Sequence, residues 1–484
     1  MAHCVTILPQ NIRITVADGE NLLKALRSAG VSPDAPCGGS GTCGKCKVLI
    51  DGQEVLACRT AVDGDITVQF PRKGNMQMLG SPETNAALSH GGDLLLAVDI
   101  GTTTVAGYLL RGEDGQELAC AAIPNPQAAF GADVLTRIRH ALQGQQEALT
   151  RAIRTAVEQL AAQLCEAAET SPAQIKKVCI VGNPAMQQLF LGISPENLAR
   201  IPFAPVLTKA EIVPANVYIP CCANAELMII PDISGFVGAD TVACVIALNL
   251  EKVQTPTLLV DIGTNGEMVL CANGRMVACS TAAGPALEGA GIYQGITARA
   301  GAIDHVWLED GSFRCSTIGG EPPTGICGSG LIDAVAAALN AGLLNERGKI
   351  LRDSGTIPLT GGIRLTQEDI RALQLAKGAI AAGISLMARH LGIGLEEIGA
   401  VFLAGAFGSY LNPESACRIG LLPQQLLGRI TAAGNAAGLG AKMLVSGAAS
   451  PEDAERLTKH IEFLELAALD AFPRSFANHM RFQP

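Results

Sequence analysis

The segment LLLAVDIGTTTVAGYLL, residues 94–110, decides the fold of most of this chain. An apolar run typical of a buried strand leads into Asp-Ile-Gly-Thr, and a second apolar run follows, which together predict a hairpin. The arrangement recurs as TLLVDIGTNGEMVL at 257–270. One Gly-Thr turn between strands is a weak signal, because such turns are common. Two copies far apart in one chain predict that the same device is used twice.

The residue types in both turns suit a nucleoside triphosphate. Gly101 and Gly263 allow the backbone to approach phosphate oxygens, because they carry no Cβ. Asp99 and Asp261 end the first strand of each hairpin, where a carboxylate can hold the water shell of Mg²⁺ or orient an attacking water. We expect these two aspartates to be catalytic. Hydroxyl, amide and backbone donors for the phosphates would come from Thr102, Thr103, Thr104, Thr264 and Asn265.

A third segment, AVFLAGAFGSYLN at 400–412, predicts a strand, a turn and then a helix. Small residues in that turn would let an adenosine lie against the backbone. An ordinary turn that packs a helix on a strand explains the segment alone, but the two hairpins favour the nucleotide. The expected contacts are Gly405, Ala406, Phe407 and Gly408.

Further residues in Gly-rich turns have two explanations each. Asp240 in GFVGADTVA and Glu288 in GPALEGAG suit contacts to Mg²⁺-bound water or ribose, although helix caps explain them equally. Gly328 in TGICGSGLID precedes an Ala-rich segment, where glycines form a phosphate cup or permit close helix packing. Cys327 in the same motif reads as a small packing residue. Lys377 is either a snorkelling surface lysine or a contact to nucleotide or partner.

The N-terminal part carries a different signal, CGGSGTCGKC at 37–46 followed by LAC at 56–58. A Gly-rich loop with three thiols and a fourth thiol on a later segment can surround a small [2Fe–2S] cluster. Plant-type ferredoxins space the loop C-x4-C-x2-C, and this loop is one residue longer. A zinc knuckle and structural thiols are the alternatives. The expected metal ligands are Cys37, Cys43, Cys46 and Cys58.

The sequence around this loop predicts the elements of a small ferredoxin-like module. NLLKALRSAG (21–30) predicts a helix stopped by Gly30, and KVLIDGQEVLAC (47–58) predicts a hairpin that turns at Asp51-Gly52. Both elements lie where a β-grasp module would need them.

Composition places the chain among compact α/β proteins. The 484 residues are 48% hydrophobic and 17% charged, and the net charge of −10 argues against nucleic acid or an anionic membrane as partner. The start MAHCVTILPQ shows no signal peptide, and no uninterrupted apolar run predicts a membrane span. Sixteen cysteines without export indicate a reducing compartment, so we expect a cytoplasmic protein.

Changes in pattern divide the chain into four parts. Residues 1–70 form the cluster module, and the polar, Gly- and Pro-containing segment 71–93 reads as a linker. From Leu94 onward, apolar strands alternate with Ala-rich helices, the pattern of an α/β fold. We expect an N-terminal lobe at 94–254 and a C-terminal lobe at 255–484.

The two hairpins and the late turn resemble the superfamily of acetate and sugar kinases, heat-shock chaperones and actin. The resemblance to the reductive activators of corrinoid proteins is closer and covers nearly the whole chain. Besides the cluster module, it rests on NPQAAFGADVLTRI (125–138), VGNPAMQQLFLG (181–192), PDISGFVGADTVA (231–243), AAGPALEGAGI (282–292), TGICGSGLIDAV (324–335) and DIRALQLAKGAIAAGI (369–384).

This resemblance implies a β-grasp [2Fe–2S] ferredoxin-like module fused to a two-lobed ribonuclease-H-like ATPase. The implied cofactors are the cluster, ATP and Mg²⁺. The implied partners are a corrinoid protein as electron acceptor and a low-potential cellular reductant, and a homodimer is left open. Longer relatives carry a further small domain between the linker and the ATPase, which this chain lacks.

Three other functions compete with this one. A kinase for a small metabolite explains residues 94–484 but leaves the cluster idle. An ATP-driven donor to a non-corrinoid enzyme, like the activators of hydroxyacyl-CoA dehydratases, would hold a [4Fe–4S] cluster between subunits rather than an N-terminal ferredoxin module. A nucleotide sensor without turnover is the third alternative.

Overall fold

The computed structural model describes residues 2–8, 12–29, 33, 46–50, 52–70, 92–408 and 410–482. These residues belong to two compact units. The first unit holds the N-terminal module, the chain up to Gly235 and the later segment Leu444–Pro451. The second unit holds Phe236–Met443 and Glu452–Pro484. The expected lobe boundary at 254/255 and the other predicted domain limits remain predictions.

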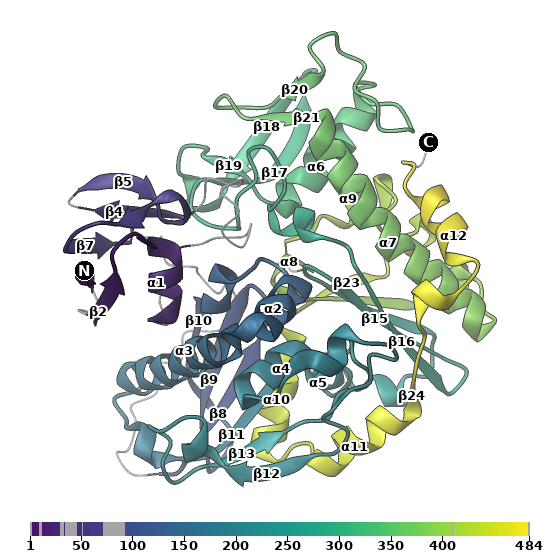
Figure 1. Cartoon of the computed structure of the whole chain (residues 1–484). Coiled ribbons are helices and arrows are strands. Elements are labelled where there is room, and N and C mark those ends of the chain that lie inside the picture. Colours follow the sequence, from purple (N-terminus) through teal and green to yellow (C-terminus); the bar gives the residue numbers. More distant parts are fainter. Residues whose placement is uncertain are drawn as a thin grey trace. The chain divides into compact units, whose positions relative to one another are not determined.

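The N-terminal module is a five-stranded sheet in the order β2-β1-β7-β4-β5 with one helix (Figure 1). β1 pairs antiparallel with β2 and parallel with β7, as in a β-grasp fold. The core beneath α1 contains Val5, Ile7, Leu26, Val48 and Val68. The elements are β1 (Ala2–Leu8), β2 (Ile12–Ala17), α1 (Leu22–Ser28), β4 (Lys47–Ile50), β5 (Gln53–Leu56) and β7 (Ile66–Gln69).

Both expected local elements of this module are present. Asn21 caps α1 by accepting a hydrogen bond from the Lys24 N–H at 3.3 Å, which explains why the helix begins where it does. β4 and β5 pair antiparallel with Ile50 opposite Gln53, which leaves a two-residue connection. Gly52 in that connection has φ +83, a value that glycine adopts at little cost. The proposed helix stop, Gly30, lies outside the described residues.

The remainder of the first unit surrounds a six-stranded sheet in the order β10-β9-β8-β11-β13-β12. The long helix α3 (Gln146–Ala167) packs on β9 and β10, and Gly107 makes this close approach possible. A Cβ at Gly107 would lie 2.8 Å from Leu160 Cδ2. The strands are β8 (Leu94–Ile100), β9 (Thr104–Arg111), β10 (Glu117–Pro124), β11 (Ile175–Gly182), β12 (Glu211–Pro214) and β13 (Glu226–Ile229).

Two shorter helices of the first unit lie near the first hairpin turn. They are α2 (Val134–His140), capped by Asp133, and α4 (Pro184–Leu191), capped by Asn183. Each cap accepts a hydrogen bond from a main-chain N–H in the first helical turn, which fixes where the helix starts.

The second unit has its own six-stranded sheet, in the order β23-β22-β14-β15-β16-β24. Its core contains buried residues of α6 (Gly328–Asn340) and α7 (Gln367–Leu391), and Figure 1 shows α12 (Phe472–His479) beside α7. Its strands are β14 (Thr257–Ile262), β15 (Gly266–Ala272), β16 (Arg275–Thr281), β22 (Ala400–Ala404), β23 (Ile430–Gly434) and β24 (Ile461–Phe463).

A smaller sheet and a further helix also belong to the second unit. A small sheet in the order β18-β17-β19 lies next to α6, and α5 (Ala239–Ala247) also belongs to this unit. The strands of the small sheet are β17 (Ala302–Glu309), β18 (Ser312–Thr317) and β19 (Gly325–Ile326).

The two large sheets repeat one arrangement, which confirms the duplicated hairpin. In the first, β8 pairs antiparallel with β9 and parallel with β11. In the second, β14 pairs antiparallel with β15 and parallel with β22. Each Asp-Ile-Gly-Thr motif therefore begins in a central strand that has an antiparallel neighbour on one side and a parallel neighbour on the other.

One described helix, α7, is long and apolar enough to cross a membrane. However, 78% of its most apolar window is buried inside the protein. This burial is what a core helix of a folded domain shows, and the composition of α7 is explained by packing in the second unit.

Candidate nucleotide and cluster sites

The first hairpin turn is a tight, backbone-closed loop. The Gly101 N–H donates to the main-chain oxygen of Thr104 at 2.9 Å. A Cβ at Gly101 would lie 2.8 Å from that same oxygen, so only glycine fits without a shift of the backbone. The turn thus needs the glycine that the sequence places there, and it brings Asp99, Thr102 and Thr103 to the end of β8.

Three polar side chains from other elements hold this turn. Asn125 donates through Nδ2 to the Gly101 oxygen at 2.8 Å, and its own N–H donates to the Thr103 oxygen at 2.8 Å. Arg137 on α2 donates through Nη2 to the Thr102 oxygen at 2.6 Å. Asn183 donates through Nδ2 to the Thr102 hydroxyl at 3.2 Å. The turn is therefore fixed before any ligand arrives.

Asn125 and Arg137 were not among the predicted site residues, although both belong to the motif NPQAAFGADVLTRI. Both side chains are almost completely buried. A buried arginine in a motif dominated by small residues is the sequence signal that could have identified Arg137, since buried charges are rare unless they are paired. Asn183 combines two roles, because it caps α4 and donates to the Thr102 hydroxyl of this turn.

The second hairpin turn brings together several predicted residues of the second unit. The Gly263 N–H donates to the Asn265 oxygen at 2.9 Å, and the Thr264 hydroxyl donates to Glu288 Oε1 at 3.1 Å. Gly405 lies against the same hairpin, because a Cβ there would stand 2.5 Å from Asp261 Oδ1. Gly405 also has φ +83, so a larger residue at this position would be both strained and in collision.

Three acidic residues of the second unit influence one another. Asp261 on β14 stands directly opposite Glu267 on β15. Burial raises the pKa of Glu267 well above its usual range, and the negative charges of Asp240 and Asp261 raise it further. Burial also raises the pKa of Asp240 to about 6. Glu267 was not predicted, although its place in the register opposite Asp261 follows from a two-stranded reading of TLLVDIGTNGEMVL.

This acidic group fits a hydrated cation. A divalent ion would offset the burial and the repulsion that raise the pKa of Glu267, and the burial that raises the pKa of Asp240. Among the described residues, no three His, Cys, Asp or Glu side chains are close enough to bind one bare metal ion. Mg²⁺ usually keeps several of its waters and uses one or two carboxylates, so the arrangement suits Mg²⁺ better than a fully caged metal.

The third segment forms the expected strand, turn and helix, β22, Gly405–Gly408 and α9 (Pro413–Arg418). The turn Gly405–Gly408 is itself a single helical turn, α8. The left-handed Gly405 ends β22, and the chain can then begin the helix immediately. For Ala406 and Phe407 only the backbone is described.

Glycines of the TGICGSGLID motif pack closely. A Cβ at Gly330 would lie 2.3 Å from the Ile303 oxygen, so this glycine lets α6 contact β17. The buried Cys327 donates through Sγ to the same oxygen at 3.3 Å, in line with a packing role. Gly328 begins α6, and its phosphate contact remains a prediction.

Lys377 lies in the core rather than at the surface, with its side chain 1% exposed. Its Nζ donates to the Arg481 oxygen and stands over the Phe482 ring. Burial lowers the pKa of Lys377 to about 7. The snorkelling interpretation is therefore wrong, and the contacts of the ammonium anchor the last described residues of the chain.

Two of the four predicted cluster ligands are described. Cys46 is buried, Cys58 is half-buried, and the Cys58 N–H donates to Cys46 Sγ at 3.5 Å. A backbone N–H directed at a ligand sulfur is typical of iron–sulfur sites, so this pair fits a cluster. All described cysteines are free thiols. Cys37 and Cys43 lie outside the described residues.

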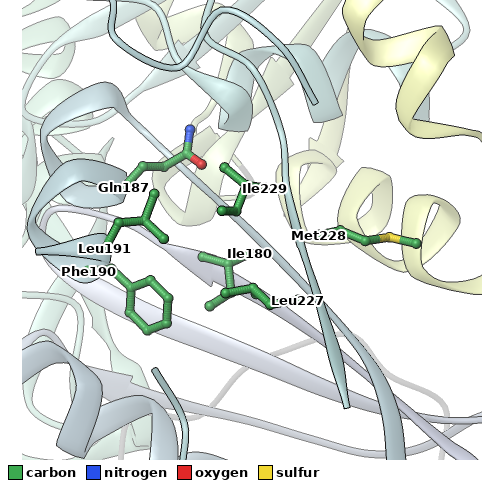
Figure 2. Close-up of a pocket in the computed structure, with 7 residues that line it drawn as sticks. All are labelled: Ile180, Gln187, Phe190, Leu191, Leu227, Met228 and Ile229. Atoms are coloured by element: carbon green, nitrogen blue, oxygen red, sulfur yellow. The ribbon is translucent and has the colours of Figure 1, made fainter. Parts of the chain in front are cut away.

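A cavity between α4 and strands β11 and β13 is not a nucleotide site. Figure 2 shows the side chains that line it, of which Gln187 alone is polar. Its volume is about 10 Å³, room for a single water at most. Gln187 donates to Asp232 Oδ1 at 2.9 Å, so its amide serves a structural contact.

Comparison with known proteins finds a family model for each of three regions of the chain. Residues 5–67 match the 2Fe-2S iron-sulfur cluster binding domain, residues 94–253 match the RACo middle region, and residues 255–484 match the C-terminal ASKHA domain of RACo. These matches, together with the sheets described above, confirm the predicted fold class.

Individual relatives agree with the domain matches. The corrinoid activation enzyme RamQ of Eubacterium limosum is 34% identical over 402 residues, which cover 76% of this chain and 67% of that relative. A [Co(II) methylated amine-specific corrinoid protein] reductase of Methanosarcina barkeri is 29% identical over 283 residues, 52% of each protein.

A solved structure of a relative also matches this chain, over nearly its whole length. The reductive activator for a corrinoid, iron-sulfur protein superposes with a TM-score of 0.73 at 27% identity, covering 99% of this chain and 98% of that one. The N-terminal ferredoxin-like module, the two repeated Asp-Ile-Gly-Thr hairpins and these relatives together show that the chain belongs to the family of reductive activators of corrinoid proteins.

Proposed function

We propose that this protein is an ATP-dependent reductive activator. It passes an electron from its [2Fe–2S] cluster to the Co(II) corrinoid of a protein in a methyltransferase system, and so restores Co(I). The observation that carries the proposal is the presence, in one chain, of a cluster module and of two phosphate hairpins in a family whose relatives act on corrinoid proteins.

The energetics of electron transfer explain why the proposed function needs both an iron–sulfur cluster and a nucleotide site. A bound plant-type cluster supplies a single electron at a potential near −400 mV. Each 100 mV by which the acceptor lies below this potential costs about 2.3 kcal/mol for one electron. ATP hydrolysis can supply several kcal/mol only if it is coupled to a conformational change, because a ligand shifts an equilibrium by its differential affinity for two states. We propose that nucleotide binding changes the coordination of the docked corrinoid.

The roles of individual residues follow from their contacts. Main-chain N–H groups of the two turns, that of Thr264 among them, and the hydroxyl of Thr102 would bind phosphate oxygens. Asp99 and Asp261 would orient Mg²⁺-bound water or the attacking water, and Glu288 would hold Thr264 in place through its 3.1 Å hydrogen bond. Mg²⁺ would neutralise phosphate charge as it does in other phosphoryl-transfer sites.

The remaining parts of the proposal concern the surroundings of the protein. The acceptor is a corrinoid protein, the upstream donor is a low-potential reductant, and the compartment is the cytoplasm. A homodimer stays an open prediction. The match to RamQ covers 67% of that relative.

The decisive experiment mixes the purified protein with a Co(II) corrinoid protein and a low-potential reductant. Co(I) should appear, by its absorbance, only when ATP is also present. Free phosphate should be released in step with Co(I), since the phosphoryl group goes to water. Co(I) formation at an equal rate without ATP would refute the coupling, and stoichiometric phosphorylation of a sugar or acid would favour a kinase.

A further inference from the structure

Two adjacent cysteines, Cys221 and Cys222, lie in the connection between β12 and β13 and face α3. Their sulfurs are 3.9 Å apart. The Cys221 N–H donates to Glu158 Oε1 at 3.1 Å, and Cys221 Sγ lies 4.0 Å from the Glu158 main-chain oxygen. The pair is therefore held in a defined position against α3. Neither residue belongs to the nucleotide or cluster sites.

The two thiols differ in accessibility and in acidity. Cys221 is half-buried, whereas Cys222 is completely buried. A hydrogen bond from Cys222 lowers the pKa of Cys221, although burial and the Glu158 carboxylate oppose this effect. The same hydrogen bond and burial raise the pKa of Cys222. The accessible sulfur is thus the one that more readily carries the negative charge, which is the reactive form of a thiol.

Two other cysteines of the same unit, Cys179 and Cys165, lack this combination. Burial raises the pKa of Cys179 to about 12, and that residue is completely enclosed in β11. Cys165 on α3 is 1% exposed, and burial raises its pKa too. Cys165 is close enough to interact electrostatically with the pair, because the charge of Cys221 raises the pKa of Cys165 and the charge of Cys165 raises the pKa of Cys222. It is nevertheless shielded from solvent, so a reagent would reach Cys221 first.

We propose that Cys221 and Cys222 form a reversible thiol-modification site that reacts with low-molecular-weight disulfides. The Cys221 thiolate attacks one sulfur of the small disulfide, forms a mixed disulfide and releases one small thiolate. Cys222 then loses its proton and attacks the Cys221 sulfur, and the second small thiolate leaves. Two protein thiols are oxidised, and one small disulfide is reduced to two thiols.

The geometry makes the disulfide between Cys221 and Cys222 easy to reduce. A disulfide needs a sulfur–sulfur distance of about 2.05 Å and usually joins Cα atoms about 4.4–6.8 Å apart. Adjacent residues have Cα atoms about 3.8 Å apart, so the bridge would be strained. Strained disulfides have higher reduction potentials and are the labile ones. Cys222 also donates its N–H to the Ile219 oxygen at 2.9 Å, a contact that closure of the bridge would disturb.

The test treats the full-length, cluster-loaded protein with excess oxidised glutathione without oxygen, blocks the remaining thiols with an alkylating reagent, and maps peptides by mass spectrometry. The peptide that holds Cys221 and Cys222 should lose two hydrogens and carry no glutathione. A reducing agent should restore both thiols. The Cys222→Ser variant should stop at the first step and keep one glutathionyl group on Cys221.

Two controls keep the result interpretable. Cys315 of the second unit is also half-buried, but burial raises its pKa, so it should react about tenfold more slowly than Cys221. Thermal midpoints of Cys222→Ser and Cys222→Ala should confirm that both variants fold, and both should accumulate the adduct. A bridge from Cys221 to Cys165, or equal labelling of Cys221 and Cys315, would overturn the proposal.

Discussion

The side chain of Asn125 donates a 2.8 Å hydrogen bond to the Gly101 oxygen, while its main-chain N–H donates another of 2.8 Å to the Thr103 oxygen. One buried residue thus fixes both sides of the first phosphate turn. Its side-chain oxygen is also engaged, because it accepts from the Gln127 N–H at 2.9 Å. If the turn binds nucleotide as proposed, these contacts make Asn125 a positioning residue for it.

Replacing Asn125 by Ala should therefore weaken both the fold and the site. The change leaves buried backbone groups without their partner, which commonly costs about 1–3 kcal/mol of unfolding free energy. ATP affinity, measured by calorimetry, should fall as well, because the turn loses its fixed shape. The exposed Asn478 on α12 provides the matched control, and Asn478→Ala should change neither quantity. Equal ATP affinity in Asn125→Ala and wild type would contradict the positioning role.

Asp261→Asn and Asp99→Asn should each lower ATP hydrolysis at least about tenfold, since each removes a charge at a phosphoryl site. The assay measures released phosphate in the presence of Mg²⁺. Both variants should keep the electron paramagnetic resonance signal of the cluster, because the change lies outside the N-terminal module. Asp353→Asn, at an exposed loop position, serves as the control. Undiminished hydrolysis in both active-site variants would make the hairpins purely structural.

Glu267 should make the free energy of unfolding of the metal-free protein depend on pH. Its pKa is raised in the folded state, so the folded protein holds a proton that the unfolded chain releases above about pH 4.5. The contribution of Glu267 to stability is therefore fully present below that pH and is lost as the pH rises through the raised pKa. Glu267→Gln should flatten this decline in denaturant titrations. An unchanged pH profile would show that the carboxyl does not hold the proton.

The effect of Mg²⁺ on thermal stability provides an independent test of Glu267. It should raise the thermal midpoint of the wild type more than that of Glu267→Gln, because a ligand that binds only the folded state stabilises it. Equal shifts would exclude Glu267 from the ion's surroundings.

Lys377 should make stability depend on pH in the opposite direction to Glu267. Its pKa is about 7 in the folded protein and 10.5 ordinarily, so the unfolded chain binds the extra proton between these values. Stability should rise with pH in that window, with a slope of at most about 1.4 kcal/mol per pH unit. Lys377→Met should remove this slope, as followed by unfolding at several pH values. A slope that persists in the variant must come from another group.

Cys46→Ser should abolish the rhombic low-temperature signal of a reduced [2Fe–2S] centre, because the remaining thiols cannot complete a four-cysteine set. Iron and sulfide, measured chemically, should fall from about two of each per chain to near zero. ATP hydrolysis should continue, whereas Co(I) formation should stop. Cys4→Ser, at an exposed position on β1, should leave the cluster intact. Zinc or a four-iron stoichiometry in the wild type would contradict the assignment.

The strands and turns of both phosphate hairpins could be predicted because their information is local. Apolar runs such as Leu94–Ile100 and Thr257–Ile262 end at Asp-Ile-Gly-Thr, and the glycine is required by the close approach seen at Gly101. The helix capped by Asn21 was likewise visible in a few consecutive residues. The fold follows from such patterns once two copies of one device are recognised.

The partners of the site residues could not be predicted in the same way. Arg137 contacts Thr102 across 35 residues of sequence, a contact that depends on where tertiary packing places α2 in the first unit. Lys377 shows the same limit, because its helix position alone did not reveal that the C-terminal segment covers it. The site assignments of Cys37 and Cys43 rest on sequence alone.

The segment Leu444–Pro451 belongs to the first unit, although it follows Phe236–Met443 of the second unit in sequence. This order has a consequence for biosynthesis. A ribosome releases the chain from its N-terminus, and domains generally fold as units during synthesis. The N-terminal module can form early, but the first unit must wait for its last segment until all of Phe236–Met443 has been made. During that interval the strand-rich intermediate lacks part of its packing, and it is the stage of synthesis at which a chaperone would most improve the yield.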